Sequence, residues 1–203
     1  NHCMKATFMA KPFATLPGSG MHLHLSLYDN HGENLLAPKN SKKLNQAVSG
    51  ILDLMPESMI FCAPHANSYH RFEENSYAPI NATWGKDNRT TALRIPSGNE
   101  DSTRIEHRLS GADANPYLVM AMLISGFLHG FKEDPEIPPE TVGNGYEDGS
   151  RPLPQSWEAA LDLFQNKSRL SSILGQEFST LYRQLKSGEQ KRFRRVITPH
   201  EYD

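Results

Sequence analysis

The chain has 203 residues, in which 21 lysines and arginines nearly balance 23 aspartates and glutamates, so its formal net charge is −2 with neutral histidines. This balance argues against a protein that binds nucleic acid or a membrane surface through bulk charge. Hydrophobic residues make up 37% of the chain, which together with the glycines is enough for a packed core. No Pro- or Ser-rich linker divides the sequence, so we expect one domain over residues 1–203.

The apolar segments and the cysteines limit the cellular locations that we expect for the protein. The longest apolar stretch, residues 117–128, contains Ser125 and Gly126 and is well short of the roughly 20 residues that span a bilayer. Two cysteines, Cys3 and Cys62, are too few for a disulfide framework, and no Cys-x-x-Cys occurs. We therefore expect no membrane partner and a reducing, cytoplasmic location.

The first predicted element is a strand over Met21–Leu27. Apolar and polar residues alternate strictly along it, which is typical of a half-buried strand. Its other face then carries His22, His24 and Ser26 in a row. A Gly-Ser-Gly turn precedes the strand, which gives the backbone freedom to turn or to approach a ligand closely.

A helix is predicted next, from Ser41 as its N-cap to about Pro56. Apolar residues recur at helical spacing within it, at Leu44, Val48 and Ile51. A loop-rich region separates this helix from the next predicted strand.

Two further strands are predicted, over Thr91–Ile95 and Arg104–Leu109. Because side chains alternate along a strand, Arg104, Glu106 and Arg108 share one face of the second strand. A row of two arginines and a carboxylate is either solvated or lines a polar cleft.

The C-terminal half is predicted to be helical. Pro116 opens a helix at a position where its missing N–H does no harm, and Tyr117–Phe131 is apolar nearly all round, so we expect that helix to be buried. Residues 134–154, rich in Pro, Gly and acids, are predicted to be surface loop. Two or three helices follow, over about Trp157–Gln165, Ser168–Lys186 and Glu189–Val196, packed through Trp157, Leu161, Phe164, Leu170, Leu174, Leu181 and Leu185.

Two histidines on one strand face, after a glycine-rich turn, favour a ligand site as much as a plain surface. Glu106 is the carboxylate that could share a metal ion with His22 or His24. The alternative is that Glu106 only pairs with Arg104 or Arg108.

Five arginines fall between positions 71 and 108. Guanidinium groups bind carboxylates and phosphates bidentately, so this cluster suits an anionic substrate or a transferring phosphoryl group. From the pattern alone, a solvated charged surface is the favoured alternative. The five are Arg71, Arg89, Arg94, Arg104 and Arg108.

A set of ordered motifs resembles the catalytic domain of glutamine synthetases. The resemblance covers about Lys5 to Phe131 and continues more weakly through the helical C-terminus. The motifs are Gly18-Ser19-Gly20-Met21-His22-Leu23-His24-Leu25-Ser26, Asn67-Ser68-Tyr69-His70-Arg71, Ala78-Pro79, Asn88-Arg89, Arg94-Ile95-Pro96, Arg104-Ile105-Glu106-His107-Arg108 and Asn115-Pro116-Tyr117-Leu118.

The resemblance implies an ATP-dependent ligase. In this family ATP phosphorylates the γ-carboxylate of glutamate, and an amine then attacks the γ-glutamyl phosphate to form an amide. By resemblance, His22 and Glu106 would bind one divalent cation, Mg²⁺ or Mn²⁺, which bridges phosphates and neutralises charge between two anions. His24, Ser26 and Arg104 would contact ATP.

The remaining implied roles concern glutamate and the transferring group. Arg94 would contact a phosphate, and Arg89 would stabilise the phosphoryl group in transfer. Arg71 and Arg108 would bind the glutamate carboxylates, with Gly18 offering close backbone approach to the amino acid.

Two positions depart from the family pattern. Ammonia-using members carry a glutamate before the Ala-Pro of their flap loop, where it holds and deprotonates ammonium, but this chain has Tyr77 there. Pro17 replaces an asparagine near the glutamate site. Both changes favour the branch that ligates glutamate to organic amines, the γ-glutamylpolyamine synthetase type. Glu73 and Glu74 could attract a cationic amine, although an exposed acidic pair is more often solvated.

The resemblance also implies an α+β fold, with a curved and mostly antiparallel sheet covered by helices and a helical C-terminus. The family's other metal-binding glutamates and its N-terminal β-grasp domain precede the matched region, so we expect residues 1–203 to be the C-terminal part of a catalytic domain and to be inactive alone. The family assembles in rings, which predicts a homo-oligomeric parent.

Three alternatives stay open or are disfavoured. The parent could be an ordinary ammonia-using glutamine synthetase, or a catalytically silent assembly member, although the matched site residues count against decay. A metallohydrolase is disfavoured because no His-Glu-x-x-His occurs.

Tyr146 lies near the position of an adenylylated tyrosine in some bacterial members, but its neighbours match poorly and we expect a plain surface residue.

Overall fold

The computed structural model describes residues 2–165, 168–198 and 201. A small sheet of four short strands lies at its centre, with the spatial order β1-β4-β3-β2. β4 pairs antiparallel with β1 and with β3, and β2 pairs parallel with β3. The predicted α+β architecture with a mostly antiparallel sheet is confirmed. The strands are β1 (Leu23–Leu25), β2 (Trp84–Lys86), β3 (Leu93–Ile95) and β4 (Ile105–His107).

The strands are shorter than predicted, but their alternation is as expected. Leu25 is buried, whereas His22, His24 and Ser26 are exposed. β2 was not predicted, since its Trp-Gly-Lys sequence has no alternating pattern.

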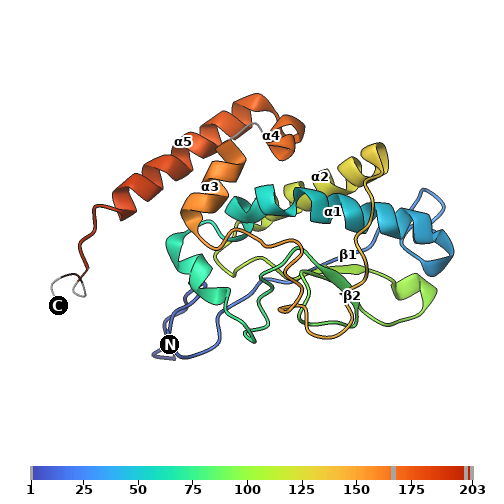
Figure 1. Ribbon diagram of the computed structural model, residues 1–203, viewed down its shortest axis with the longest axis horizontal. Helices are drawn as coiled ribbons and strands as arrows, with labels where there is room; N and C mark the ends of the chain where they lie inside the picture. The colour runs from blue at the N-terminus through green and yellow to red at the C-terminus, as the bar shows by residue number, and fades with distance from the viewer. Residues whose placement is uncertain (1, 166–167, 199–200, 202–203) are drawn as a thin grey trace.

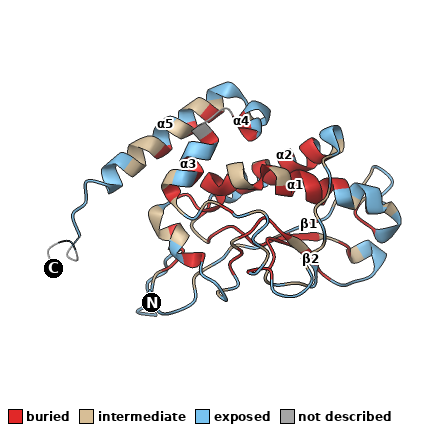
Figure 2. Ribbon diagram, viewed as in Figure 1, coloured by how far each residue is buried: buried red, intermediate tan, exposed pale blue. Residues whose placement is uncertain are grey.

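Two long helices cover the apolar face of the sheet: α1 (Ser41–Cys62) and α2 (Pro116–Glu133). Figure 1 shows them side by side above the strands, and Figure 2 shows that their centres are the most buried part of the molecule. Short 3-10 helices occupy Pro38–Asn40, Ala66–Arg71 and Glu100–Ser102.

The predicted end of the first helix at Pro56 is wrong, because α1 continues to Cys62 with Pro56 inside it. An internal proline costs about 3 kcal/mol. Met59 and Phe61 lie beyond it and are 0% and 1% exposed, and burying each such side chain contributes about 1.5–3 kcal/mol. Packing therefore outweighs the helix break. Ser41 is the first helical residue rather than the N-cap, which is Asn40.

α1 and α2 approach each other through glycines. A Cβ atom on Gly50 of α1 would overlap the backbone of Gly126 and Gly130 on α2. The same is true in reverse of Gly130, whose Cβ would meet the carbonyl oxygen of Gln46. Because these glycines have no side chains, the two helices can approach each other this closely.

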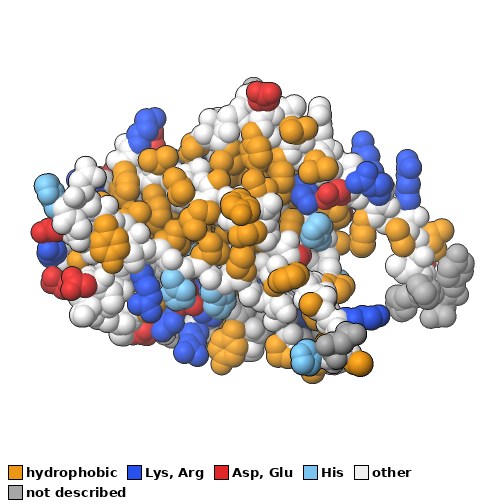
Figure 3. All heavy atoms as spheres, turned by 180° about the vertical axis from the view of Figure 1, so that it is seen from behind, with side chains coloured by type: hydrophobic (Ala, Val, Ile, Leu, Met, Phe, Trp, Pro, Cys, Tyr) orange, Lys and Arg blue, Asp and Glu red, His pale blue; other side chains and the backbone are white. Residues whose placement is uncertain are grey.

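α2 begins as predicted, since the Asn115 side chain accepts hydrogen bonds from the N–H groups of Tyr117 and Leu118. The prediction that this helix is buried is wrong for one face. Its inner face packs on α1, but no other element among the described residues covers its outer face, whose apolar side chains gather in the large hydrophobic patch of Figure 3. These outer side chains are Tyr117, Met120, Ile124 and Leu128, which are 38–83% exposed.

The C-terminal helices are α3 (Trp157–Gln165), α4 (Arg169–Leu174) and α5 (Gln176–Phe193). The second predicted helix is split at Gly175, whose φ of +93° interrupts helical geometry. α5 then runs through the boundary predicted near residue 187. Leu181 and Leu185 were predicted to pack inward, but they are 66% and 51% exposed, since Tyr182 and Lys186 take the buried side of α5.

Residues 138–153, here called the strap, were predicted to be surface loop. They contain no regular element, but they run alongside β2, where the N–H of Thr141 donates to the carbonyl of Trp84. The expectation of a surface Tyr146 is wrong, because its side chain is only 8% exposed. No helix in the part of the chain that the structure describes is long and apolar enough to cross a membrane.

Candidate functional site

The predicted site residues meet on the polar face of the sheet, opposite α1. Glu106 lies at the middle of the central strand β4, and the strand register places His24 of β1 and Arg94 of β3 directly beside it. The alternation of each strand sends all three side chains to this face. Short strands with a fixed register therefore assemble the site.

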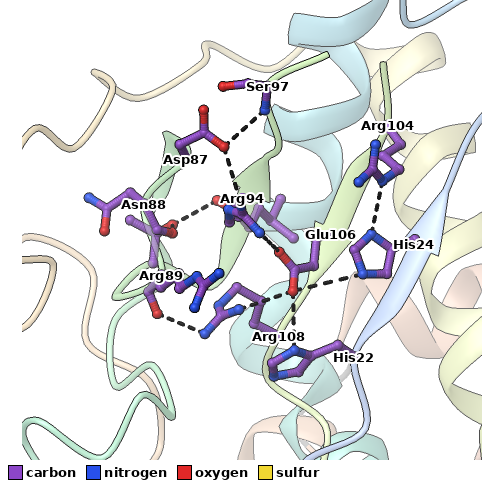
Figure 4. A network of polar contacts seen from close by, with 12 residues as sticks. His22, His24, Asp87, Asn88, Arg89, Arg94, Ser97, Arg104, Glu106 and Arg108 are labelled. Carbon is purple, nitrogen blue, oxygen red and sulfur yellow. Dashed lines mark hydrogen bonds and ion pairs between the residues drawn. The ribbon is translucent and has the colours of Figure 1, made fainter. Parts of the chain in front are cut away.

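Glu106 is the centre of a charged network, drawn in Figure 4. Its Oε2 accepts a hydrogen bond from Arg94 Nη1 at 3.0 Å, and its Oε1 accepts one from Arg108 Nη1 at 3.0 Å. His22 Nδ1 lies 3.1 Å from Oε1, and His24 Nε2 lies 3.9 Å from it. Four basic side chains thus surround one buried carboxylate.

This surrounding charge controls the ionisation of the network. Burial by itself raises the pKa of the Glu106 carboxyl, but the hydrogen bond from Arg94 and the charges of Arg108 and His22 lower that pKa below its usual value. The His22 side chain is 37% exposed, and the partial burial of its imidazole and the charge of Arg108 lower its pKa, against the opposing effect of Glu106. At neutral pH the carboxyl is ionised and the imidazole is neutral, which are the forms that bind metal ions.

His24 and Arg104 form the nucleotide end of the predicted site. Arg104 Nε donates to His24 Nδ1 at 3.2 Å. Of the two arginines that share a strand face with Glu106, it is Arg108 that forms an ion pair with it. Ser26 lies beyond β1, where its hydroxyl contacts the carbonyl of Thr103 at 3.5 Å. These side chains share one face, but Ser26 lies at its margin.

Arg71 reaches the site from the 3-10 helix over Ala66–Arg71 through a passage lined by glycines. A Cβ on Gly18 would lie 2.6 Å from Arg71 Cγ, and one on Gly20 would lie 2.9 Å from Arg71 Nη2 and 3.5 Å from His22 Nε2. Arg71 is only 4% exposed, and its Nη1 donates to the carbonyl of Leu109 at 3.1 Å. The Nη2 end of the guanidinium and the His22 imidazole therefore both lie beside Gly20.

Arg108 links the network to two loops. Its Nη2 donates to the carbonyl of Arg89 at 2.8 Å and contacts the carbonyl of Tyr77 at 3.4 Å. The Arg89 side chain is exposed, and Figure 4 shows it beside Arg108. Tyr77 is 64% exposed and has a left-handed backbone with φ of +60°.

The alternative of a plain solvated arginine surface is wrong for most of the cluster. Arg71 and Arg108 are buried, and Arg94 and Arg104 are half-buried, so only Arg89 is exposed. Burying a guanidinium is costly unless it is paired, which the carboxylate and carbonyl partners above provide.

The two acidic residues of the flap loop do not join this network. Glu73 Oε2 pairs with Lys11 Nζ at 3.6 Å, and Glu74 is exposed. Their side chains therefore behave as solvated surface groups.

The predicted metal ligands fit only one side of a cation site. His22 Nδ1 and Glu106 Oε1 are close enough to be neighbouring ligands of one ion. Within the ranges 2–165, 168–198 and 201, however, no three His, Cys, Asp or Glu side chains are grouped to hold a metal. A Mg²⁺ ion takes six oxygen-rich ligands, so an ion held here would need its other ligands from phosphates, water or protein outside these residues.

Sequence reasoning missed two residues of the site. Asp87 Oδ1 accepts a hydrogen bond from Arg94 Nη2 at 3.0 Å and one from the Ser97 N–H at 2.9 Å, so it holds the second arm of the Arg94 fork. No local pattern marks it. Gly20 leaves room for Arg71 and was recognised only as part of a flexible turn.

The motifs, the sheet and this network together match one known family. Residues 1–203 match the family model described as the catalytic domain of glutamine synthetase. The chain belongs to this family. It is 44% identical over 205 residues to the gamma-glutamylputrescine synthetase PuuA of Escherichia coli, covering 100% of this chain and 43% of that protein.

Other family members are similar over the same extent. The chain is 38% identical over 200 residues to a gamma-glutamylethanolamide synthetase of Streptomyces coelicolor, covering 98% of this chain and 43% of that protein. The solved structure of apo GmaS superposes with a TM-score of 0.84 at 29% identity, covering 96% of this chain and 46% of that one. The chain therefore spans less than half the length of these relatives.

Proposed function

We propose that the parent of this chain is an ATP-dependent ligase that joins the γ-carboxylate of glutamate to an organic amine through γ-glutamyl phosphate. Tyr77 carries the proposal. It replaces the glutamate that ammonia-using members place before Ala-Pro, and it stands exposed beside the Arg108 guanidinium. A tyrosine side chain lacks the carboxylate that would form an ion pair with ammonium and take its proton.

The relatives support the same choice. The two relatives named above from Escherichia coli and Streptomyces coelicolor, at 44% and 38% identity, are named for amide synthesis with putrescine and with ethanolamine. Glutamine synthetases of Methanococcus maripaludis and Aquifex aeolicus are 31% and 34% identical. An exposed aromatic ring offers an apolar surface to the methylene groups of an organic amine, which ammonium lacks.

The geometry suggests how the chain's own residues divide the work. Arg71 and Arg108 would bind the glutamate carboxylates, with Gly18 leaving room beside Arg71. Arg94, held as a fork by two carboxylates, would contact a phosphate. Arg89 has a free approach to solvent and would stabilise the transferring phosphoryl group.

ATP and a divalent cation complete the proposal. His24, Arg104 and Ser26 would contact ATP, and His22 with Glu106 would hold Mg²⁺ or Mn²⁺. When bound, the cation neutralises the phosphates that must meet the glutamate carboxylate. We further propose that residues 1–203 are the C-terminal part of a catalytic domain, inactive alone, in a ring-forming homo-oligomer of the cytoplasm.

The test is phosphate release by the full-length parent with ATP, Mg²⁺ and glutamate, offering ammonium, putrescine, spermidine or ethanolamine. We expect release with an organic amine and little with ammonium. Tyr77→Glu should raise the ratio of ammonium to organic-amine kcat/KM by about tenfold or more, whereas Tyr77→Phe, which keeps the ring, should leave the ratio unchanged.

Two outcomes would reject the proposal. Release driven best by ammonium would make the parent an ordinary glutamine synthetase and remove the significance of Tyr77. No release with any amine would favour a catalytically silent assembly member.

A further inference from the structure

The strap is bonded to the loops that carry the site. Asn88 Nδ2, in the loop before Arg89, donates to the carbonyls of Thr141 at 3.1 Å and Gly143 at 2.8 Å. On the other side, Asn81 Nδ2 donates to the carbonyl of Gly145 at 3.1 Å. A segment without regular structure thus fastens two loops that are distant from it in sequence.

Tyr146 is the buried side chain at the middle of the strap. It is 8% exposed, and its hydroxyl donates to the carbonyl of Ala78 at 3.2 Å. Burial raises the pKa of this phenol, so the hydroxyl stays protonated and remains a donor. Its acceptor is the residue that directly follows Tyr77.

The loop of residues 72–79 needs such support. Asn75 and Tyr77 have φ of +63° and +60°, a conformation that non-glycine residues keep only when their surroundings hold them. Inside the loop, the Ser76 hydroxyl contacts the carbonyls of Arg71 at 2.9 Å and Glu73 at 2.6 Å. From outside, the loop is held at Tyr77 by Arg108 and at Ala78 by Tyr146.

We propose that Tyr146 is a positioning residue for this loop. The Tyr146 hydroxyl fixes the position of Tyr77 and, through the Tyr77 carbonyl, the orientation of the Arg108 guanidinium. Its effect on substrates rests on the proposed function, because Tyr77 and Arg108 are the residues assigned there to the amine and glutamate. The hold on the loop itself does not depend on that function.

The full-length parent is compared with its Tyr146→Phe and Tyr182→Phe variants. Tyr182 is a matched control, because its side chain is 7% exposed and its hydroxyl donates to the carbonyl of Ile60 at 3.1 Å, away from the site. Each change removes one buried hydroxyl donor and keeps the ring, so both variants should lose similar thermal stability.

Two readouts separate positioning from general stability. In Tyr146→Phe, hydrogen exchange of the amides in residues 72–79 should speed up by about three- to tenfold, as expected for losing one hydrogen bond. The KM for the amine and for glutamate should rise by a similar factor while the KM for ATP is unchanged. Tyr182→Phe should change neither readout.

If the amides of residues 72–79 exchanged at the same rate in the two variants, the proposal would be overturned, whether or not the parent shows ligase activity. Faster exchange with unchanged KM values would overturn its functional part. Absence of amine-dependent turnover would instead refute the proposed function, and the exchange comparison would still decide whether Tyr146 holds the loop.

Discussion

The close crossing of α1 and α2 predicts that the substitution Gly50→Ala, which adds one methyl group, strongly destabilises the fold. A Cβ there would overlap the carbonyl oxygen of Gly126 and the backbone of Gly130. These are backbone atoms of α2 on the face that packs against α1, so they cannot rotate away as a side chain could, and the two helices must separate.

The magnitude follows from two opposing effects. Overpacking a core costs about 1–3 kcal/mol, and a backbone overlap belongs at the upper end. Alanine is better than glycine in a helix by about 1 kcal/mol. The net loss should be about 2 kcal/mol, which lowers the unfolding midpoint of a chain of this size by about 4–8 °C.

Circular dichroism of the purified chain on heating measures this shift. Gly188→Ala is the matched control, because Gly188 is also inside a helix but has no atom within 4 Å of its Cβ position. That variant should gain about 0.5–1 kcal/mol. If Gly50→Ala were as stable as the original chain, the close crossing of α1 and α2 would be refuted.

Two further predictions concern the site. The pKa of Glu106 is lowered in the fold, so its ion pairs contribute stability that is present above the pKa of an unfolded glutamate, about 4.3, and that is lost as pH falls through the folded pKa. The unfolding midpoint of the original chain should therefore drop more steeply on acidification than that of Glu106→Gln. Parallel curves of midpoint against pH for the two proteins would contradict this prediction. Gly20→Ala should displace Arg71 Nη2 and raise the KM for glutamate in the parent without changing that for ATP, whereas Gly149→Ala, whose Cβ position is open, should change neither.

Local patterns predicted the pieces of this fold that depend on local physics. Strict alternation identified the row from His22 to Ser26, because a strand places every second side chain on one face. The Asn-Pro pair located the start of α2, because Asn115 satisfies free helix N–H groups whatever else packs nearby. The motifs likewise indicated the family and nearly all residues of the network.

Packing decided what those patterns could not. α1 continues through Pro56 since the residues beyond it are buried by distant parts of the chain. Tyr146 and Asp87 carry no local pattern, because their contacts lie with residues brought near only by folding. Leu181 and Leu185 follow helical spacing, yet α5 turns a different side inward.

The sequence by itself determined which chemical groups are present and on which strand faces they lie, because side-chain alternation and helix capping act over a few residues. Only the tertiary structure decided that Arg94 and His22 join Arg108 at Glu106. His22, Arg94 and Glu106 come from different segments, and they meet because the strand register aligns them and because leaving a buried charge unpaired is too costly.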